Sequence, residues 1–290
     1  MQLVQAERPT MPISNALLGY PEDARLLLVN ADDFGSSHGN TAAICQAIER
    51  GIVSSPSLMA PCPWAAWAMA WLRDHPEVPF AVHLTMVCEY PMYRWGPIAP
   101  RHDVKSLLAS DGYFPTEQDC EAHVEDVRIE HVETEFRAQI AWVRAAGLEP
   151  THLDFHCLPD GGRDDITDLT ARIAAEEGLA MRTHGRGITD RLRAEGRAVV
   201  DHPVVDSYGL PVEGRLEQYL GLLHDLPVGV TEWAVHPGLG TEELRTMEPE
   251  SWKIRRGDLD VVTSIAIREA IAAEGITLIT WREMQATWQP

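Results

Sequence analysis

The stretch RLLLVNADDFG at residues 25–35 sets the fold of this 290-residue chain. Its first eight residues are mostly apolar and end in polar turn residues, which is typical of a strand buried in a parallel sheet. Residues 36–50 then predict a helix, because apolar residues recur at helical spacing and Gly51 offers a stop. A strand that leads into a helix is the repeating unit of α/β proteins.

The rest of the chain continues this alternation. Strands are predicted at residues 52–58, 79–84, 151–156, 179–183, 229–236 and 276–280, and helices at residues 64–73, 116–146 (one or two), 166–177 and 263–273. Seven or eight strands suit a closed or partly closed (β/α) barrel of mostly parallel strands, with a doubly wound open sheet as the alternative. We expect residues 1–20 to form an N-terminal arm and residues 21–290 a single barrel-like domain that carries the functional site.

Composition and charge exclude several classes of protein. The formal net charge is −20, and no Lys/Arg cluster is present, so nucleic-acid binding is not expected. No basic segment followed by an apolar core begins the chain, and no run of about 18 apolar residues occurs, so neither a secretion signal nor a membrane span is predicted. The five cysteines are widely spaced without a C-x-x-C pair. They are expected to be small buried residues in a reducing, cytoplasmic compartment.

Carboxylate and imidazole side chains stand at the ends of four separate predicted strands. They are Asp32 and Asp33, His83, the set His152, Asp154 and His156, and His236. Because the carboxyl ends of parallel strands meet at one edge of a barrel or open sheet, where ligands bind, these residues predict one shared site.

The motif HLDFH at residues 152–156 has strand periodicity, so its two histidines and its aspartate can all face inward. Each histidine can equally be a hydrogen-bonded core residue, and His152, the deepest in the strand, is the best candidate for that role. Asp32 and Asp33 can cap the following helix. Two carboxylates after a buried strand are nevertheless costly without a counter-charge, and a cation would satisfy both.

One aspartate with two histidines is the ligand set of a metal site that keeps positions open for water and substrate. Two imidazoles favour zinc, cobalt or nickel over magnesium, which prefers oxygen ligands. A spare carboxylate can then act as a general base on an attacking water, and His236 suits a general acid because imidazole titrates near neutrality.

At these residues the chain resembles the ChbG/HpnK (YdjC-like) carbohydrate deacetylases. The motifs occur in order: N-A-D-D-F-G at 30–35, G-x-x-S at 51–54, A-V-H-L-T at 81–85, T-H-L-D-x-H at 151–156 and H-P-G at 236–238. The resemblance implies a barrel-like, NodB-related fold and hydrolysis of an acetamide on an amino sugar or chito-oligosaccharide. It implies one divalent metal ion, zinc favoured, with magnesium, cobalt or nickel as alternatives. It implies that the metal ligands are Asp33, His83 and His156. It also implies that Asp32 is the general base and that His236 is the general acid.

The chain departs from many such proteins after the last ligand, where Cys157 and Leu158 replace further histidines. The long segment 85–115 is rich in proline and aromatic residues, and loops of this length are usually functional. In it Tyr93 and Trp95 are candidates for stacking on a sugar and Arg94 for binding an anionic group, although the same residues can simply pack the loop. Asp154 and Arg182 complete the candidate substrate contacts.

Two other functions fit the same residues. A metal-dependent sugar isomerase or phosphoesterase can use a similar barrel, and a sugar-binding homologue can keep the fold without activity. The expected partner in every case is a small carbohydrate, and a homodimer is compatible with the fold family.

Overall fold

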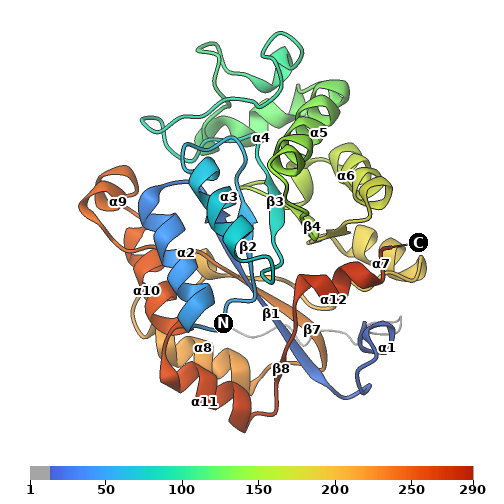
Figure 1. The fold of residues 1–290 in the computed structure, drawn as a ribbon, viewed down its shortest axis with the longest axis vertical. Helices are drawn as coiled ribbons and strands as arrows, with labels where there is room; N and C mark the ends of the chain where they lie inside the picture. The colour runs from blue at the N-terminus through green and yellow to red at the C-terminus, as the bar shows by residue number, and fades with distance from the viewer. Residues whose placement is uncertain (1–13, 290) are drawn as a thin grey trace.

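Eight parallel strands form one sheet in the computed structural model, which describes residues 14–289 (Figure 1). The strand order is β5-β4-β3-β2-β1-β7-β6, and β8 pairs with β1 beside this path. The strands are β1 (Arg25–Phe34), β2 (Ser55–Leu58), β3 (Ala81–Leu84), β4 (His152–Phe155), β5 (Ala180–Met181), β6 (Val205–Asp206), β7 (Gly229–Val235) and β8 (Thr277–Leu278).

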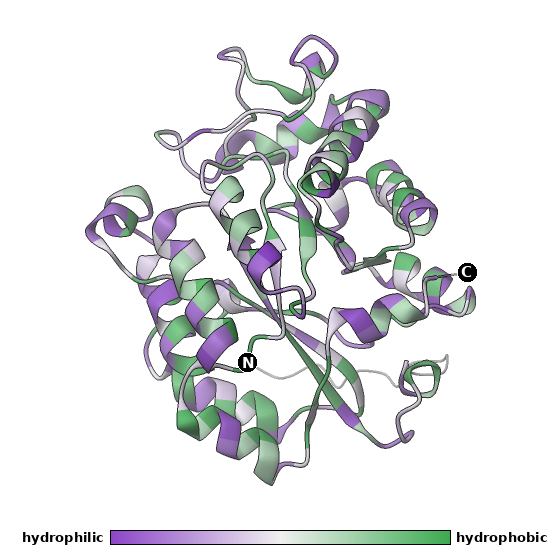
Figure 2. Ribbon diagram, viewed as in Figure 1, coloured by the Kyte–Doolittle hydropathy of each residue, from purple (hydrophilic) through white to green (hydrophobic). Residues whose placement is uncertain are grey.

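Helices fill the connections and cover the sheet (Figure 1). They are α1 (Asn15–Leu18), α2 (His38–Arg50), α3 (Ala65–Asp74), α4 (Glu117–Glu125), α5 (Ile129–Ala145), α6 (Asp164–Glu177), α7 (Arg186–Ala194), α8 (Arg215–His224), α9 (Glu242–Met247), α10 (Trp252–Val262), α11 (Ile265–Ala273) and α12 (Trp281–Ala286). The short 3₁₀ turns are η1 (Lys105–Leu107), η2 (Pro159–Gly162) and η3 (Ser207–Gly209). Their ribbons carry both apolar and polar residues, as expected of helices with one face on a core (Figure 2).

Strand β1 is the centre of the core. Leu26, Leu27, Leu28 and Val29 have no exposed surface. Along its length β1 pairs with β7 on one side, while β8 and then β2 share the other side. A strand covered on both faces and both edges must be apolar throughout until it reaches the functional edge.

The predicted barrel-like α/β fold with parallel strands is confirmed. Within the described residues the ladder of strands ends at β5 and β6, so the barrel is partly closed. The strands predicted at 179–183 and 276–280 exist but pair over only two residues each. Strand β6 and the helices α1, α7, α8, α9, α10 and α12 were not predicted from the sequence.

Two residues of the arm predicted at residues 1–20, Ser14 and Tyr20, form hydrogen bonds with the domain. The backbone N–H of Ser14 donates to Asp201 at 3.1 Å, and its hydroxyl donates to the Val199 carbonyl at 2.7 Å. The Tyr20 hydroxyl donates to Glu283 Oε1 at 2.6 Å. Residues 1–13 lie outside the described residues. No helix from residue 14 to residue 289 is both long and apolar enough to span a bilayer.

Candidate active site

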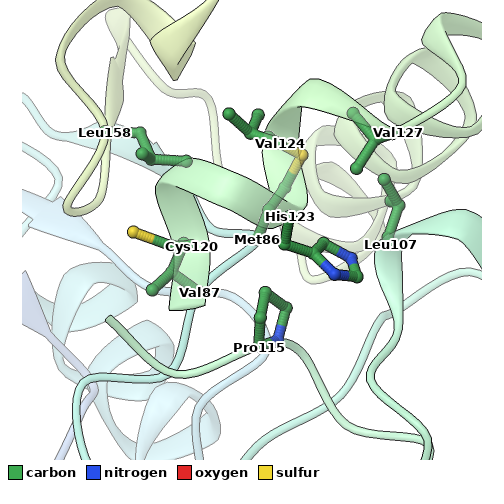
Figure 3. A pocket seen from close by; sticks show the side chains of 9 residues that line it. All are labelled: Met86, Val87, Leu107, Pro115, Cys120, His123, Val124, Val127 and Leu158. Carbon is green, nitrogen blue, oxygen red and sulfur yellow. The ribbon is translucent and has the colours of Figure 1, made fainter. Parts of the chain in front are cut away.

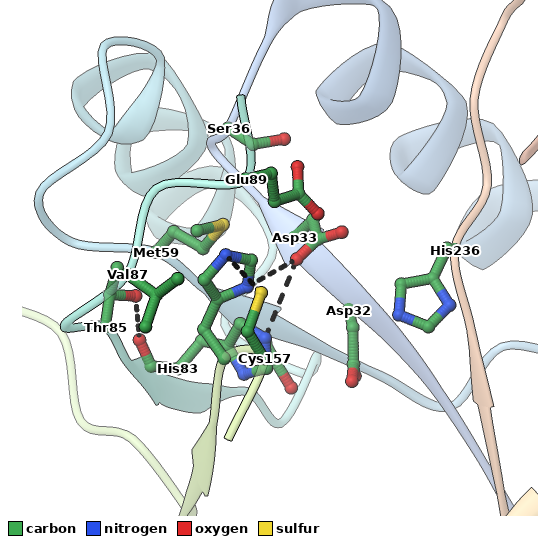
Figure 4. Close-up of polar contacts among 12 residues, drawn as sticks. Asp32, Asp33, Ser36, Met59, His83, Thr85, Val87, Glu89, Cys157 and His236 are labelled. Atoms are coloured by element: carbon green, nitrogen blue, oxygen red, sulfur yellow. Dashed lines mark hydrogen bonds and ion pairs between the residues drawn. The ribbon is translucent and has the colours of Figure 1, made fainter. Parts of the chain in front are cut away.

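The carboxyl end of β1 delivers two consecutive carboxylates to one region. The register between β1 and β2 shifts between Ala31 and Phe34, and Asp33 adopts a left-handed conformation with φ 70°. Such irregularities re-aim side chains at strand ends. Asp32 and Asp33 are therefore both close to His83, from different sides, and both are buried (Figure 4).

Three potential metal-ligating atoms converge at this edge. Asp33 Oδ1 lies 3.6 Å from His83 Nε2 and 3.2 Å from His156 Nδ1. One atom from each residue lies within 4.8 Å of the other two, and all three side chains are buried. One carboxylate oxygen and two imidazole nitrogens around a single point are a donor set that fits a divalent cation such as zinc.

The far side of the His83 ring is held by Asp154. His83 Nδ1 lies 2.8 Å from Asp154 Oδ1, and the Ser57 hydroxyl donates to Asp154 Oδ2. Burial alone would lower the pKa of His83, but Asp154 and the neighbouring Asp33 and Asp32 raise it to about 10. A carboxylate on the outer nitrogen is the usual partner of a metal-binding histidine. Asp154 is fully buried, so it orients the His83 ring and does not make the predicted contact with substrate.

Arg182 is also an internal residue rather than a substrate contact. Its guanidinium binds both oxygens of Asp32, at 2.8 and 2.9 Å, and lies 3.1 Å from Asp154 Oδ2 and 2.9 Å from Glu232 Oε1. The side chain is 2 % exposed. Burial would raise the pKa of Asp32, but the Arg182 charge lowers it, so this carboxylate stays ionised near neutral pH.

Arg255 of α10 is a functional-site residue that the sequence analysis missed. It is fully buried; Nη1 lies 2.7 Å from Asp33 Oδ2, Nη2 lies 3.1 Å from Glu89, and Nε pairs with Glu248. By occupying Asp33 Oδ2, Arg255 leaves Oδ1 for His83 and His156. No sequence signal identified it, because basic residues on a helix usually face solvent.

His236 directly follows β7 and faces Asp32 and Asp33 across the site (Figure 4). Ser207 Oγ lies 2.8 Å from His236 Nδ1, and the His236 backbone N–H donates to Asp258 Oδ2 at 2.8 Å. The Tyr208 ring contacts the His236 imidazole edge to face, with centroids 4.5 Å apart. Ser207 and Tyr208, which the sequence analysis also missed, therefore fix the orientation of this imidazole and leave Nε2 to face the site.

His152 has the structural role that the sequence analysis considered. Its ring stacks on Trp281 with centroids 4.2 Å apart, and its Nδ1 lies 3.0 Å from the Thr151 hydroxyl. Burial lowers the pKa of His152 to about 3, so the ring is neutral and packs as an aromatic core residue.

The three predicted substrate contacts in the 85–115 segment have internal partners. The Tyr93 hydroxyl donates to the Ser36 carbonyl at 2.7 Å, Arg94 lies 3.2 Å from Asp111, and the buried Trp95 ring donates through Nε1 to the Val87 carbonyl at 2.9 Å. These contacts pack the loop, which was the alternative interpretation.

Cys157 lies beside the candidate ligand His156 and, together with Glu89 and His156, forms a second group of side chains that could hold a metal ion. Its Sγ lies 3.2 Å from His156 Nε2, the nitrogen opposite the one that faces Asp33. Burial raises the pKa of the Cys157 thiol well above its usual value, so the group is a neutral thiol. All five cysteines are free; four of them are buried, as predicted, whereas Cys157 is only partly buried.

A separate small pocket lies beneath the long loop (Figure 3). Its lining is mostly apolar and includes Met86, Leu107, Val124 and Leu158, with Cys120 and His123 as the titratable groups. None of the carboxylates or histidines of the candidate site lines this pocket, so we attribute it to loop packing.

Comparison with known proteins places this fold and site in a family. Residues 26–273 match the profile of the YdjC-like proteins, and the chain belongs to the YdjC-like family. A carbohydrate deacetylase of Thermus thermophilus is 31 % identical over 90 % of this chain and 94 % of its own length. A carbohydrate deacetylase of Geobacillus stearothermophilus is 29 % identical over 89 % of this chain and 98 % of its own.

A solved structure has the same overall fold. A crystal structure from Enterococcus faecalis V583, described as a candidate cellobiose-phosphate cleavage protein, superposes with a TM-score of 0.75 at 26 % identity. The match covers 89 % of this chain and 98 % of that one. The similarity therefore extends through the whole domain.

Proposed function

We propose that this protein is a metal-dependent deacetylase that hydrolyses the N-acetyl group of an amino sugar or chito-oligosaccharide. The observation that carries the proposal is the convergence of Asp33 Oδ1, His83 Nε2 and His156 Nδ1 on one point. The names of the YdjC-like relatives, carbohydrate deacetylases, support the substrate class.

Asp33, His83 and His156 would hold one divalent cation, and zinc suits two imidazoles and a carboxylate best. When bound, such an ion polarises the scissile carbonyl and lowers the pKa of an attacking water to about 7. Asp154 and Arg255 orient two of the ligands from outside, through His83 Nδ1 and Asp33 Oδ2.

Asp32 takes the role of general base. Its ionised carboxylate, fixed by Arg182, accepts a proton from the water that attacks the acetyl carbon. His236 then donates a proton to the departing sugar nitrogen, so that water and amide become acetate and amine. Ser207 on Nδ1 orients the imidazole for this transfer.

The test is acetate release from a panel of N-acetylated mono- and oligosaccharides by the zinc-loaded protein. Asp32→Asn is expected to lower the rate by about 10² to 10⁴, the usual contribution of a general base, while the metal content stays at one per chain. Asp260→Asn is the matched control, because Asp260 is an exposed aspartate paired with Arg256 on the outside of α10.

Each outcome decides between the candidate functions. Unchanged activity of Asp32→Asn would refute its role as base. No acetate from any sugar, with the metal bound, would refute deacetylation and favour the isomerase or phosphoesterase alternative. Absence of both acetate and bound metal would favour a non-catalytic sugar-binding protein.

A further inference from the structure

Pairing of β6 with β7 places Tyr208 beside His236, the proposed general acid. In the β6–β7 pairing Asp206 lies opposite Ala234, so Tyr208 and His236 each stand two residues beyond the same rung. Asp206 Oδ1 accepts the Tyr208 backbone N–H at 2.8 Å, which fixes the η3 turn. The side chain of Tyr208 is therefore held at the functional edge by backbone structure.

The Tyr208 ring lies against two residues of the proposed site, His236 and Arg255. It meets the His236 imidazole edge to face at 4.5 Å, and the Arg255 guanidinium lies 5.6 Å from the ring centroid. Arg255 in turn holds Asp33 Oδ2. Tyr208 thus adjoins the proposed acid on one side and, through Arg255, a metal ligand on the other.

The Tyr208 hydroxyl is a free donor in this position. The residue is 37 % exposed, and its hydroxyl has no hydrogen-bond partner among residues 14–289, whereas Tyr90 and Tyr93 nearby both have one. Desolvation raises the pKa of Tyr208 well above 10; the Arg255 charge opposes this shift, and carboxylates such as Glu89 add to it. The hydroxyl keeps its proton and can donate it in a hydrogen bond.

We propose that Tyr208 is a catalytic residue whose hydroxyl donates a hydrogen bond to the acetyl oxygen of the substrate. The inference rests on the proposed function. As water adds to the acetyl carbon, negative charge develops on that oxygen, and a preorganised donor stabilises the transition state more than the ground state. The proton stays on Tyr208 throughout, because the hydroxyl only donates a hydrogen bond.

The test compares Tyr208→Phe with the wild-type protein, both loaded with zinc. Loss of one such donor costs about 10² in kcat, and we expect that loss with KM changed little. Tyr113→Phe is the matched control: Tyr113 is 38 % exposed and packs against Arg94 and Arg101 in the loop. An unchanged kcat, or a rise in KM alone, would overturn the assignment.

Binding of the product acetate gives a second readout that does not need turnover. A hydrogen bond to a charged oxygen is worth about 1.5–3 kcal/mol, so acetate should bind the zinc-loaded Tyr208→Phe protein about tenfold more weakly or worse. Equal acetate affinity would overturn the inference even if no sugar in the panel is a substrate. Failure of the wild-type protein to release acetate would instead count against the proposed function.

Discussion

The contact between Asp154 and His83 gives the sharpest test of the proposed metal site. Asp154→Asn keeps the size of the side chain but replaces the charged acceptor at 2.8 Å from His83 Nδ1 by a neutral one. Loss of such an outer partner usually lowers metal affinity by about 10- to 100-fold, or about 1.4–2.7 kcal/mol. We therefore expect the zinc affinity of Asp154→Asn, measured by competition with a chelator, to fall within that range.

Glu232→Gln separates this effect from a loss of stability. Glu232 is also fully buried, and its Oε1 lies 2.9 Å from Arg182 Nη2, but it has no contact with His83. Both variants replace a buried charged acceptor on Arg182 by a neutral amide and so weaken charged hydrogen bonds, each worth about 1.5–3 kcal/mol of folding free energy. Only Asp154→Asn should lose zinc affinity. Equal affinity in Asp154→Asn and wild type, or an equal loss in the two variants, would refute the orienting role of Asp154.

Two further predictions concern the framework around the site. The hydrogen bond to Glu283 raises the pKa of Tyr20 from 10.0 to about 12, so its stabilisation is complete below pH 10 and is lost as pH rises through 12. Urea unfolding should show wild type more stable than Tyr20→Phe below pH 10, with the difference vanishing toward pH 12; a difference independent of pH would contradict this. A Cβ at Gly238 would lie 2.8 Å from Arg255 Cβ, so Gly238→Ala should cost about 1–3 kcal/mol in thermal unfolding. Gly221→Ala, in a helix with open space around it, should not destabilise the protein, and equal effects of the two substitutions would show that Gly238 is not tightly packed.

The strand β1 and the residues at its end were predictable because their signal is local. A run of buried apolar residues identifies a parallel strand, and its carboxyl end is the functional edge in any α/β sheet. The same logic placed His83, His156 and His236 together, and the structure brings them to that edge. Strand alternation in HLDFH also predicted that Asp154 would face inward, but it did not show which partner Asp154 would meet.

Not every short strand was predictable, since a two-residue pairing leaves no periodicity in the sequence; β5 and β8 were expected within longer apolar runs, whereas β6 was not. Strand β6, with Val205–Asp206, is the clearest case. Its position beside β7 is decided by pairing with a strand more than twenty residues later. The residues that follow it, Ser207 and Tyr208, meet His236 for that reason alone.

By itself the sequence determined the class of fold, the edge that carries the site and the types of side chain gathered there, because these follow from the periodicity and ends of single strands. Only the tertiary structure decided what each of those side chains contacts. Arg182 binds Asp32 and Arg255 binds Asp33 across more than a hundred residues of chain. Which buried charge meets which is set by the packing of elements distant in sequence, and no local pattern records it.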